Sequence, residues 1–234
     1  MSKKWDKELN LIAQIEGWLS DEVAELLMSF AARVSKGVIV EVGSWKGKST
    51  VGMALANPNC KIYAVDPFTG SQEHEHLAAS KVDTYSEFVE NIQKYQVKEQ
   101  ITPLRMTSRE ALHEVKEDIS MVFIDGSHEY DDVKLDFDTW FPRLIPGGVI
   151  LFHDSKWQGV KRVLWEDFYL QELLGPIDRV EDTTFAIKLS HPKGECIEHN
   201  KSLLNLEFDK HRLKRLKRKL KRFGARLEQD DSIE

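Results

Sequence analysis

The chain has 234 residues and a formal net charge of −6, with 41% hydrophobic and 31% charged residues. This length is enough for one sizeable α/β domain with some appended structure, and the composition excludes a disordered chain. The two cysteines, Cys60 and Cys196, lie far apart in the sequence. Their spacing argues against a disulfide framework and against a zinc site.

The N-terminus, MSKKWDKELN, lacks the apolar stretch of a signal peptide, and no apolar run is long enough to span a bilayer. With only two cysteines, these features predict a cytoplasmic protein. A peripheral position at the inner membrane surface stays open.

Strand and helix patterns alternate along the chain. Residues 5–35 carry apolar residues at spacings of three and four, and a break at Ser20-Asp21 predicts two helices, the second capped by Ser20. Buried strands are predicted at 37–43, 61–67, 101–106, 119–125 and 149–154, with two short strands in 177–190. Helices are predicted at 50–56, 84–95, 108–115, 133–144 and 160–173.

This alternation predicts an α/β fold with a doubly wound, mostly parallel sheet that helices cover on both faces. We expect an N-terminal helical segment at 1–36, the sheet domain at 37–190 and a C-terminal extension at 191–234. Polar residues close several of the predicted strands, namely Glu41, Asp66, Asp125 and His153-Asp154. Because ligands bind at the carboxyl ends of such strands, these residues predict a binding site there.

The first strand leads into EVGSWKGKS, residues 41–49. Its glycines follow a G-x-x-x-G spacing, which is neither the dinucleotide fingerprint nor a P-loop, and such a turn also occurs without a ligand. Glu41 would repel a pyrophosphate and attract an ammonium group, while Asp66 is placed to bind two ribose hydroxyls. A ligand with a ribose, a positive charge and no phosphate fits these residues, and S-adenosylmethionine is such a ligand.

Five motifs within residues 37–190 make the chain resemble class I S-adenosylmethionine-dependent methyltransferases. The resemblance is to the branch that includes bacterial sugar and antibiotic O-methyltransferases, and the motifs are EVGSWKGKS, YAVDPFTG, MTSREAL, FIDGSHEY and PGGVILFHD. It implies a Rossmann-like methyltransferase fold with seven strands, one of them antiparallel. It also implies O-methylation of a sugar, glycoside or related small molecule.

The resemblance carries over to individual residues. It implies that Asp66 holds the ribose and that Asp125 lies at the same edge of the cofactor site. The methionine part would be surrounded by Glu41, Gly43, Ser44, Gly47 and Ser49, and the adenine would lie near Thr107 and Ser108. For Ser108 an equal alternative is a helix cap.

His128 follows a central strand, and an imidazole accepts protons near neutral pH; the resemblance makes His128 the candidate general base. The alternative is a histidine that merely bonds to Asp125 or Asp132 in a polar turn. Asp125 and Asp154 end adjacent strands and are expected to orient the acceptor and to share a divalent cation such as Mg²⁺. Ser127 and His153 depart from the acidic pattern of relatives and weaken that metal site.

Residues 209–226 hold ten Lys/Arg and one acid, so this run carries +9 and the rest of the chain −15. Apolar residues recur at spacings of three and four, which predicts an amphipathic helix: Leu206, Leu213, Leu216, Leu220, Phe223 and Leu227. An anionic membrane surface or a polyanion suits this helix. Packing on the acidic body and contact with another subunit in a homo-oligomer stay open, and no base-reading module is indicated.

Two other functions stay open at this point. A nucleotide-binding oxidoreductase would use a similar sheet, although Glu41 and the missing dinucleotide fingerprint argue against it. A non-catalytic scaffold that acts through the basic run is the second alternative.

Overall fold

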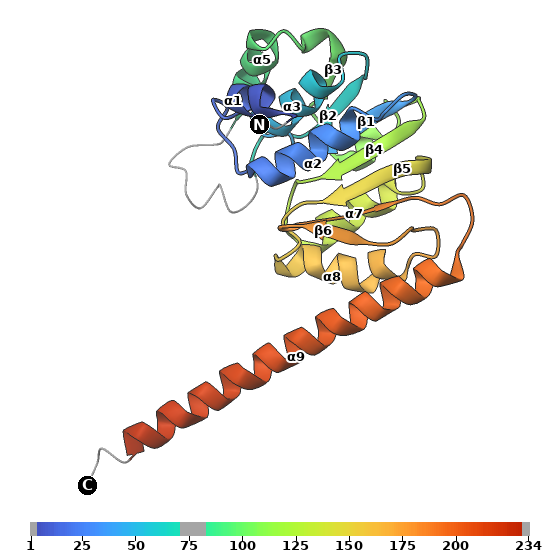
Figure 1. The fold of residues 1–234 in the computed structure, drawn as a ribbon. Helices are drawn as coiled ribbons and strands as arrows, with labels where there is room; N and C mark the ends of the chain where they lie inside the picture. Colours follow the sequence, from blue (N-terminus) through green and yellow to red (C-terminus); the bar gives the residue numbers. More distant parts are fainter. Residues whose placement is uncertain (1–3, 71–82, 231–234) are drawn as a thin grey trace.

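The computed structural model describes residues 4–70 and 83–230, with side chains in the last helix described as far as residue 214. Its centre is a seven-stranded sheet of order β3-β2-β1-β4-β5-β7-β6 (Figure 1). The strands are β1 (Val38–Val42), β2 (Ile62–Val65), β3 (Ile101–Leu104), β4 (Ile119–Ile124), β5 (Leu144–Phe152), β6 (Asp178–Val180) and β7 (Thr183–Ile187). The first five strands pair in parallel and β7 runs antiparallel to β5 and β6. The predicted Rossmann-like sheet with one antiparallel strand is confirmed.

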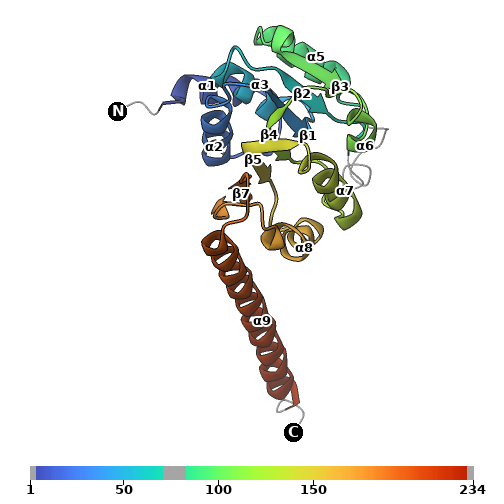
Figure 2. The ribbon, with the colours of Figure 1, turned by 90° about the vertical axis from the view of Figure 1, so that its right-hand side faces the viewer.

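Helices cover both faces of the sheet, and Figure 2 shows α2 and α7 on opposite sides of β4 and β5. One face packs against α1 (Asp6–Ile12), α2 (Asp21–Ala31), α3 (Lys48–Ala56) and α5 (Tyr85–Lys94). The other face packs against α6 (Ser108–Ala111), α7 (Tyr130–Trp140) and α8 (Gln158–Glu166). Short 3₁₀ turns are η1 (Lys98–Gln100) and η2 (Phe168–Leu170).

The alternation of side chains along β1 decides which residues face which layer. Val38, Val40 and Val42 pack in the cluster that contains α7, whereas Ile39 packs in the cluster that contains α3. Glu41 shares the face of Ile39, since side chains two apart in a strand point the same way. A strand buried on both faces needs apolar residues at nearly every position, which is why these strands are continuous apolar runs.

The structure corrects three predicted boundaries. The helix predicted at 133–144 is α7 at Tyr130–Trp140, because Pro142 cannot continue a helix, and β5 already begins at Leu144. Lys188 donates to the carbonyl groups of Phe141 (2.8 Å) and Leu144 (2.7 Å) at this helix end. The helix predicted at 160–173 ends at Glu166 and continues only as η2, and that predicted at 108–115 is a single α-helical turn at Ser108–Ala111.

The two N-terminal helices form as predicted, and the Val23 amide donates to the hydroxyl of Ser20 at 3.3 Å. The predicted domain boundaries at residues 36 and 190 stay predictions. Within the part of the chain that the structure describes, no helix is both long enough and apolar enough to cross a membrane.

The final helix, α9 (Gly194–Asp230), is 37 residues long. Its first turns are anchored to the domain, since Cys196, Asn200 and Leu204 are buried. The Asn200 side chain accepts from the amide of Ile177 (3.0 Å) and donates to the carbonyl of Gly175 (3.1 Å). Beyond these turns the helix leaves the domain and projects away from it (Figures 1 and 2).

Candidate active site

A cleft of about 370 Å³ opens at the carboxyl ends of β1, β2 and β4. It gathers most of the predicted site residues, which come from segments far apart in the sequence. Nine of them line it, namely Gly43, Ser44, Ser49, Asp66, Thr107, Ser108, Asp125, His128 and Asp154. Glu41 and Gly47 are the two that do not.

The two glycines of the first motif meet different demands. Gly43 has φ +86°, and a Cβ there would lie 2.2 Å from the carbonyl oxygen of Asp125. Only glycine therefore allows the ends of β1 and β4 to approach this closely. Gly47 has φ +88° and precedes the first residue of α3, where a Cβ would press on the Phe88 ring at 3.1 Å.

Glu41 lies buried behind the loop rather than on the wall of the cleft. Its Oε2 accepts hydrogen bonds from the hydroxyls of Ser44 (2.7 Å) and Thr50. Its Oε1 is buried without a hydrogen-bond partner among the described residues. Burial raises the pKa of the Glu41 carboxyl to about 7, against the opposing hydrogen bonds from neighbouring hydroxyls. Glu41 therefore stabilises the loop between β1 and α3 through these hydrogen bonds and does not itself line the cleft.

Asp66 lies at the end of β2 and its carboxylate lines the cleft. It accepts from the backbone amides of Trp45 (2.8 Å) and Phe68 (2.5 Å). Both residues have a positive φ, 49° for Trp45 and 59° for Phe68, which is a backbone conformation that residues other than glycine seldom adopt. Burial raises the pKa of Asp66 despite these bonds. The amides orient the carboxylate and leave lone pairs for a diol.

Thr107 and Ser108 open α6 at another wall of the cleft. Thr107 is the residue that caps this helix, in a reciprocal capping box with Glu110, so the capping role considered for Ser108 is wrong. The Ser108 hydroxyl instead accepts from the indole N–H of Trp140 at 2.8 Å. Ser108 also donates to the buried carboxyl of Asp136, whose pKa burial nevertheless raises to about 7. Asp136, on α7, also lines the cleft.

His128 is held at the cleft by two contacts. Its Nε2 lies 3.0 Å from Oδ2 of Asp154, and its ring stacks on Trp157 with centroids 4.5 Å apart. The carboxylate that it pairs with is therefore Asp154, and not Asp125 or Asp132. Gly159 of α8 packs directly against this loop, since a Cβ there would lie 2.1 Å from the His128 carbonyl oxygen.

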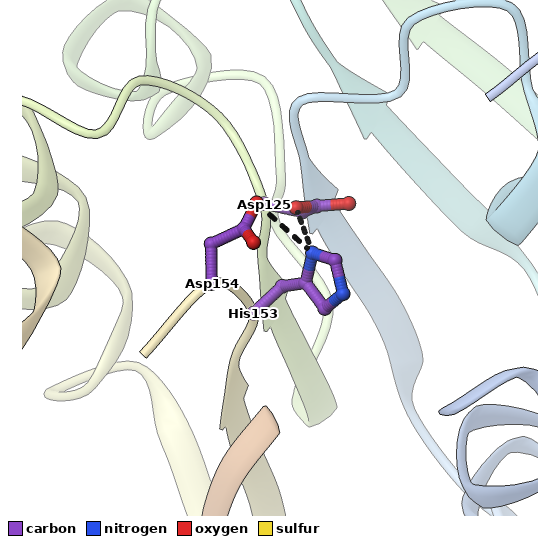
Figure 3. A group of neighbouring side chains, drawn as sticks. All are labelled: Asp125, His153 and Asp154. Carbon is purple, nitrogen blue, oxygen red and sulfur yellow. Dashed lines mark hydrogen bonds and ion pairs between the residues drawn. The ribbon is translucent and has the colours of Figure 1, made fainter. Parts of the chain in front are cut away.

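A second histidine, His153, lies between the two carboxylates that the sequence proposed as metal ligands (Figure 3). Its Nδ1 is 2.8 Å from Oδ1 of Asp125 and 3.3 Å from Oδ2 of Asp154, and its Nε2 is 3.6 Å from Oδ1 of Asp182. Burial disfavours the charged ring, but Asp125 and Asp154 outweigh it and raise the pKa of His153 to about 10. The two carboxylates thus favour the protonated form of the His153 ring.

Asp154 is shared by both histidines. Burial opposes ionisation of its carboxyl, yet hydrogen bonds with His128 and His153 outweigh burial and hold its pKa well below the usual range. The residue also has φ 51°, so its backbone is strained. A cluster that combines a strained backbone with perturbed pKa values is typical of an active site.

Aromatic side chains form part of the cleft that the sequence left unassigned. Trp18 lines it and is 70% exposed, and its ring centroid lies 5.9 Å from that of Trp45. Trp157 is 48% exposed beside His128. A tryptophan in the sequence does not by itself indicate a binding site, because its position at a cleft depends on how loops from separate segments pack together.

The charge of the cleft separates two kinds of ligand. Among the described residues, six acidic residues line it against one lysine, Lys48; they are Glu16, Asp66, Asp125, Asp132, Asp136 and Asp154. Such a surface disfavours a pyrophosphate and favours a ligand with positive charge. The donor set, with Asp66 oriented for a diol, fits S-adenosylmethionine better than a dinucleotide.

The fold and this cleft define an α/β protein with a ligand-sized cleft at the carboxyl edge of its sheet. Residues 40–155 match a family model described as a methyltransferase domain. This part of the chain belongs to that methyltransferase family, and its fold is that of the class I S-adenosylmethionine-dependent methyltransferases.

Curated proteins that are similar to this chain include one bacterial and one viral protein. Protein y4gI of Sinorhizobium fredii is 32% identical over 123 residues, which cover 50% of this chain and 13% of that protein. Protein R132 of Acanthamoeba polyphaga mimivirus is 29% identical over 118 residues, covering 49% of this chain and 50% of that protein. The chain thus spans half or less of the length of these relatives.

Solved structures share the fold at low identity. The O-methyltransferase NovP has a TM-score of 0.58 at 18% identity, covering 71% of this chain and 79% of NovP. TomG of Streptomyces achromogenes, an O-methyltransferase solved with S-adenosylmethionine, has a TM-score of 0.58 at 16% identity, covering 79% and 91%. The calicheamicin methyltransferase CalS11 has a TM-score of 0.53 at 14% identity, covering 80% and 94%.

Proposed function

We propose that the protein transfers a methyl group from S-adenosylmethionine to a hydroxyl of a sugar, glycoside or related small molecule. The observation that carries this proposal is the pair formed by His128 and Asp154 at 3.0 Å, in the same cleft as the oriented carboxylate of Asp66. A base and a cofactor anchor in one cleft are what methyl transfer to an oxygen requires.

The cofactor, when bound, supplies a methyl group on a positively charged sulfur. Asp66 would bind the ribose hydroxyls, and Thr107 and Ser108 would border the adenine. Gly43, Ser44 and Ser49 line the part of the cleft proposed for the methionine. Glu41 and Gly47 act on this part indirectly, Glu41 through Ser44 and Thr50 and Gly47 by opening α3.

His128 would accept the proton of the acceptor hydroxyl. When the Nε2–H of the neutral ring donates to Asp154, Nδ1 keeps the lone pair that takes a proton. Asp154 holds the ring in this tautomer and stabilises the charge that develops on it, as a carboxylate does for a histidine base. Asp125 would help to orient the acceptor from the adjacent strand end.

The aromatic residues of the cleft support a sugar or glycoside acceptor. Trp18 is an exposed ring that lines the cleft, and Trp157 is an exposed ring stacked on His128. Flat apolar surfaces with a polar N–H suit ring-shaped hydroxylated ligands. The CalS11 apo structure, described as a TDP-rhamnose 3′-O-methyltransferase, shares the fold with a TM-score of 0.54 at 15% identity. Its description supports the same acceptor class.

Assistance by a divalent metal is a second candidate for the reacting end. Asp125, His153 and Asp154 offer ligand atoms within 4.8 Å of one another. Mg²⁺ prefers oxygen ligands, however, and a protonated ring of His153 already offsets one of the two negative charges of these carboxylates. The residues present fit a metal only if His153 gives up its proton, so we propose that the reaction proceeds without one.

We further propose a cytoplasmic location and an anionic partner for the basic run 209–226. The location is supported by Cys60 and Cys196, both of which are buried free thiols, as expected in a reducing compartment. A homo-oligomer is a further possibility that sedimentation would test.

The first experiment is calorimetric titration of the purified protein with S-adenosylhomocysteine, repeated with Asp66→Ala. We expect micromolar binding by the wild type and its loss in the variant. Turnover with hydroxylated sugars then tests the acceptor. Absence of binding by the wild type would contradict the proposed function, and titration with NAD would follow.

A further inference from the structure

The helix α9 presents two features together: a dense run of cations and an apolar stripe. At 100° per residue, Leu213, Leu216, Leu220, Phe223 and Leu227 fall within a sector of about 100°. The ten Lys/Arg of the run occupy the remaining circumference, including both borders of the stripe. The sequence pattern on this helical backbone therefore describes a narrow apolar face surrounded by positive charge.

The structure shows that the described start of this face is not covered by the domain. Leu206 and Leu213 are 54% and 57% exposed, whereas Phe208, which lies off the stripe, contacts Trp165. Figures 1 and 2 agree that the helix projects away from the sheet and its helices. Among the described cations of the run, the ion pair present is Lys210 with Glu207 at 3.5 Å, within α9 itself. None of the described cations of this run, which are Lys210, Arg212 and Lys214, therefore has an ion pair with the acidic body.

A second copy of the helix does not suit this face either. In a heptad with Leu213, Leu220 and Leu227 at the first position, the positions that flank a coiled-coil seam carry Lys210, Arg212, Lys217, Lys219 and Arg226. Two such helices would place like charges opposite one another along the whole seam. A polyanion such as RNA would satisfy the cations and leave the leucine stripe without a role.

We propose that α9 docks on an anionic membrane surface and lies in its plane. The leucine and phenylalanine stripe would enter the boundary between headgroups and acyl chains, and the bordering Lys/Arg would reach the lipid phosphates. The remaining cations would add attraction to the surface charge of the leaflet. The helix thus tethers the domain to a membrane whether or not methyl transfer occurs.

The test is co-sedimentation of the full chain with vesicles, without cofactor or acceptor. Phosphatidylcholine vesicles are compared with vesicles that contain phosphatidylglycerol, at low and at high salt. We expect binding to the anionic vesicles alone, weakened at least tenfold by high salt, because screening reduces charge attraction.

Three variants separate the contributions. Replacing Lys217, Arg218, Lys219, Lys221 and Arg222 with glutamine removes charge, and Leu216→Gln with Leu220→Gln removes the stripe and keeps helix propensity. Each is expected to weaken vesicle binding at least tenfold. The matched control replaces five exposed lysines elsewhere with glutamine and is expected to bind like the wild type: Lys7, Lys36, Lys98, Lys116 and Lys193.

Thermal unfolding of each variant verifies that the domain is folded, independently of any ligand. Equal binding to neutral and anionic vesicles, or an equal loss in the control, would overturn the proposal. RNA or heparin binding that survives the leucine changes, without vesicle binding, would assign a polyanion instead. A dimer that the leucine changes dissociate, again without vesicle binding, would assign a second copy.

Discussion

His128 and Asp154 are 26 positions apart in the chain, and their Nε2 and Oδ2 atoms lie 3.0 Å apart at the edge of the sheet. They meet because β4 and β5 are hydrogen-bonded neighbours, with Ile124 opposite Phe152 just before each strand ends. Two side chains that follow paired strand ends thus form one hydrogen-bonded pair, which we propose as the proton-accepting unit of the cleft.

Replacing the base should stop chemistry and spare binding. We expect His128→Ala to lower kcat by roughly 10²–10⁴-fold, because general base catalysis contributes that much, and to leave S-adenosylhomocysteine affinity within about twofold. The measurement is kcat with a hydroxylated acceptor beside calorimetry. His113→Ala, at an exposed histidine away from the cleft, is the control. Unchanged turnover would remove His128 from the mechanism.

Asp154 should act through His128. Asn also tolerates the positive φ of 51° at this position, so Asp154→Asn removes charge without new backbone strain. We expect kcat of Asp154→Asn to fall. The double variant with His128→Ala should be no more than about threefold slower than His128→Ala alone, because the effects on kcat of residues that act as a unit are not additive. Fully additive losses in steady-state kinetics would show that the two side chains act separately.

The pH dependence of stability should report Glu41. Burial raises its pKa from 4.5 to about 7, so the folded chain keeps a proton that the unfolded chain releases. The stabilising contribution is full below pH 4.5 and is lost as pH rises through 7. Between pH 4.5 and 7.5, Glu41→Gln should therefore gain up to roughly 3 kcal/mol of unfolding free energy relative to the wild type.

Urea unfolding of cofactor-free protein at several pH values measures this difference. Glu110→Gln is the control, since hydrogen bonds from Thr107 lower the pKa of Glu110 and reverse the sign. A flat difference between Glu41→Gln and the wild type would mean that Glu41 is ionised in the folded chain.

Gly159 should be required for the position of His128. A Cβ at this residue would lie 2.1 Å from the His128 carbonyl oxygen, so Gly159→Ala must move the loop or α8. We expect a loss of about 1–3 kcal/mol of stability, typical of overpacking, and a lower kcat. Gly194→Ala, where a Cβ meets nothing within 4 Å, should change neither quantity. A Gly159→Ala protein with wild-type kcat and stability would contradict the close approach.

Metal removal should leave turnover unchanged. The imidazolium of His153 sits between the carboxylates of Asp125 and Asp154 and repels a second cation. Dialysis against EDTA is therefore expected to preserve kcat, and His153→Asn is expected to tighten Mg²⁺ binding at least about tenfold in calorimetry. Activity that EDTA abolishes and Mg²⁺ restores would favour the metal-assisted reaction.

Local pattern was enough for the elements and for the edge where the site lies. Strands buried on both faces read as apolar runs, and the polar residues that end them, such as Asp66 and Asp125, meet at one edge of any parallel sheet. Helix ends were predicted less well. At the end of α7, the Lys188 side chain donates to the carbonyl group of Pro142, so a residue 46 positions away helps to fix where the helix stops. Aromatic residues at the cleft, such as Trp18, had no local signal.

The sequence by itself determined the fold class, since this depends on strand periodicity, and it pointed to the cofactor and to His128 as the proposed base through residues at strand ends and the family resemblance. Only the tertiary structure decided that Asp154 is the hydrogen-bond partner of His128, that the ring of His153 lies between Asp125 and Asp154, and that α9 leaves the domain. Pairings of this kind depend on strand order and on the register between β4 and β5, which no single stretch of the chain encodes.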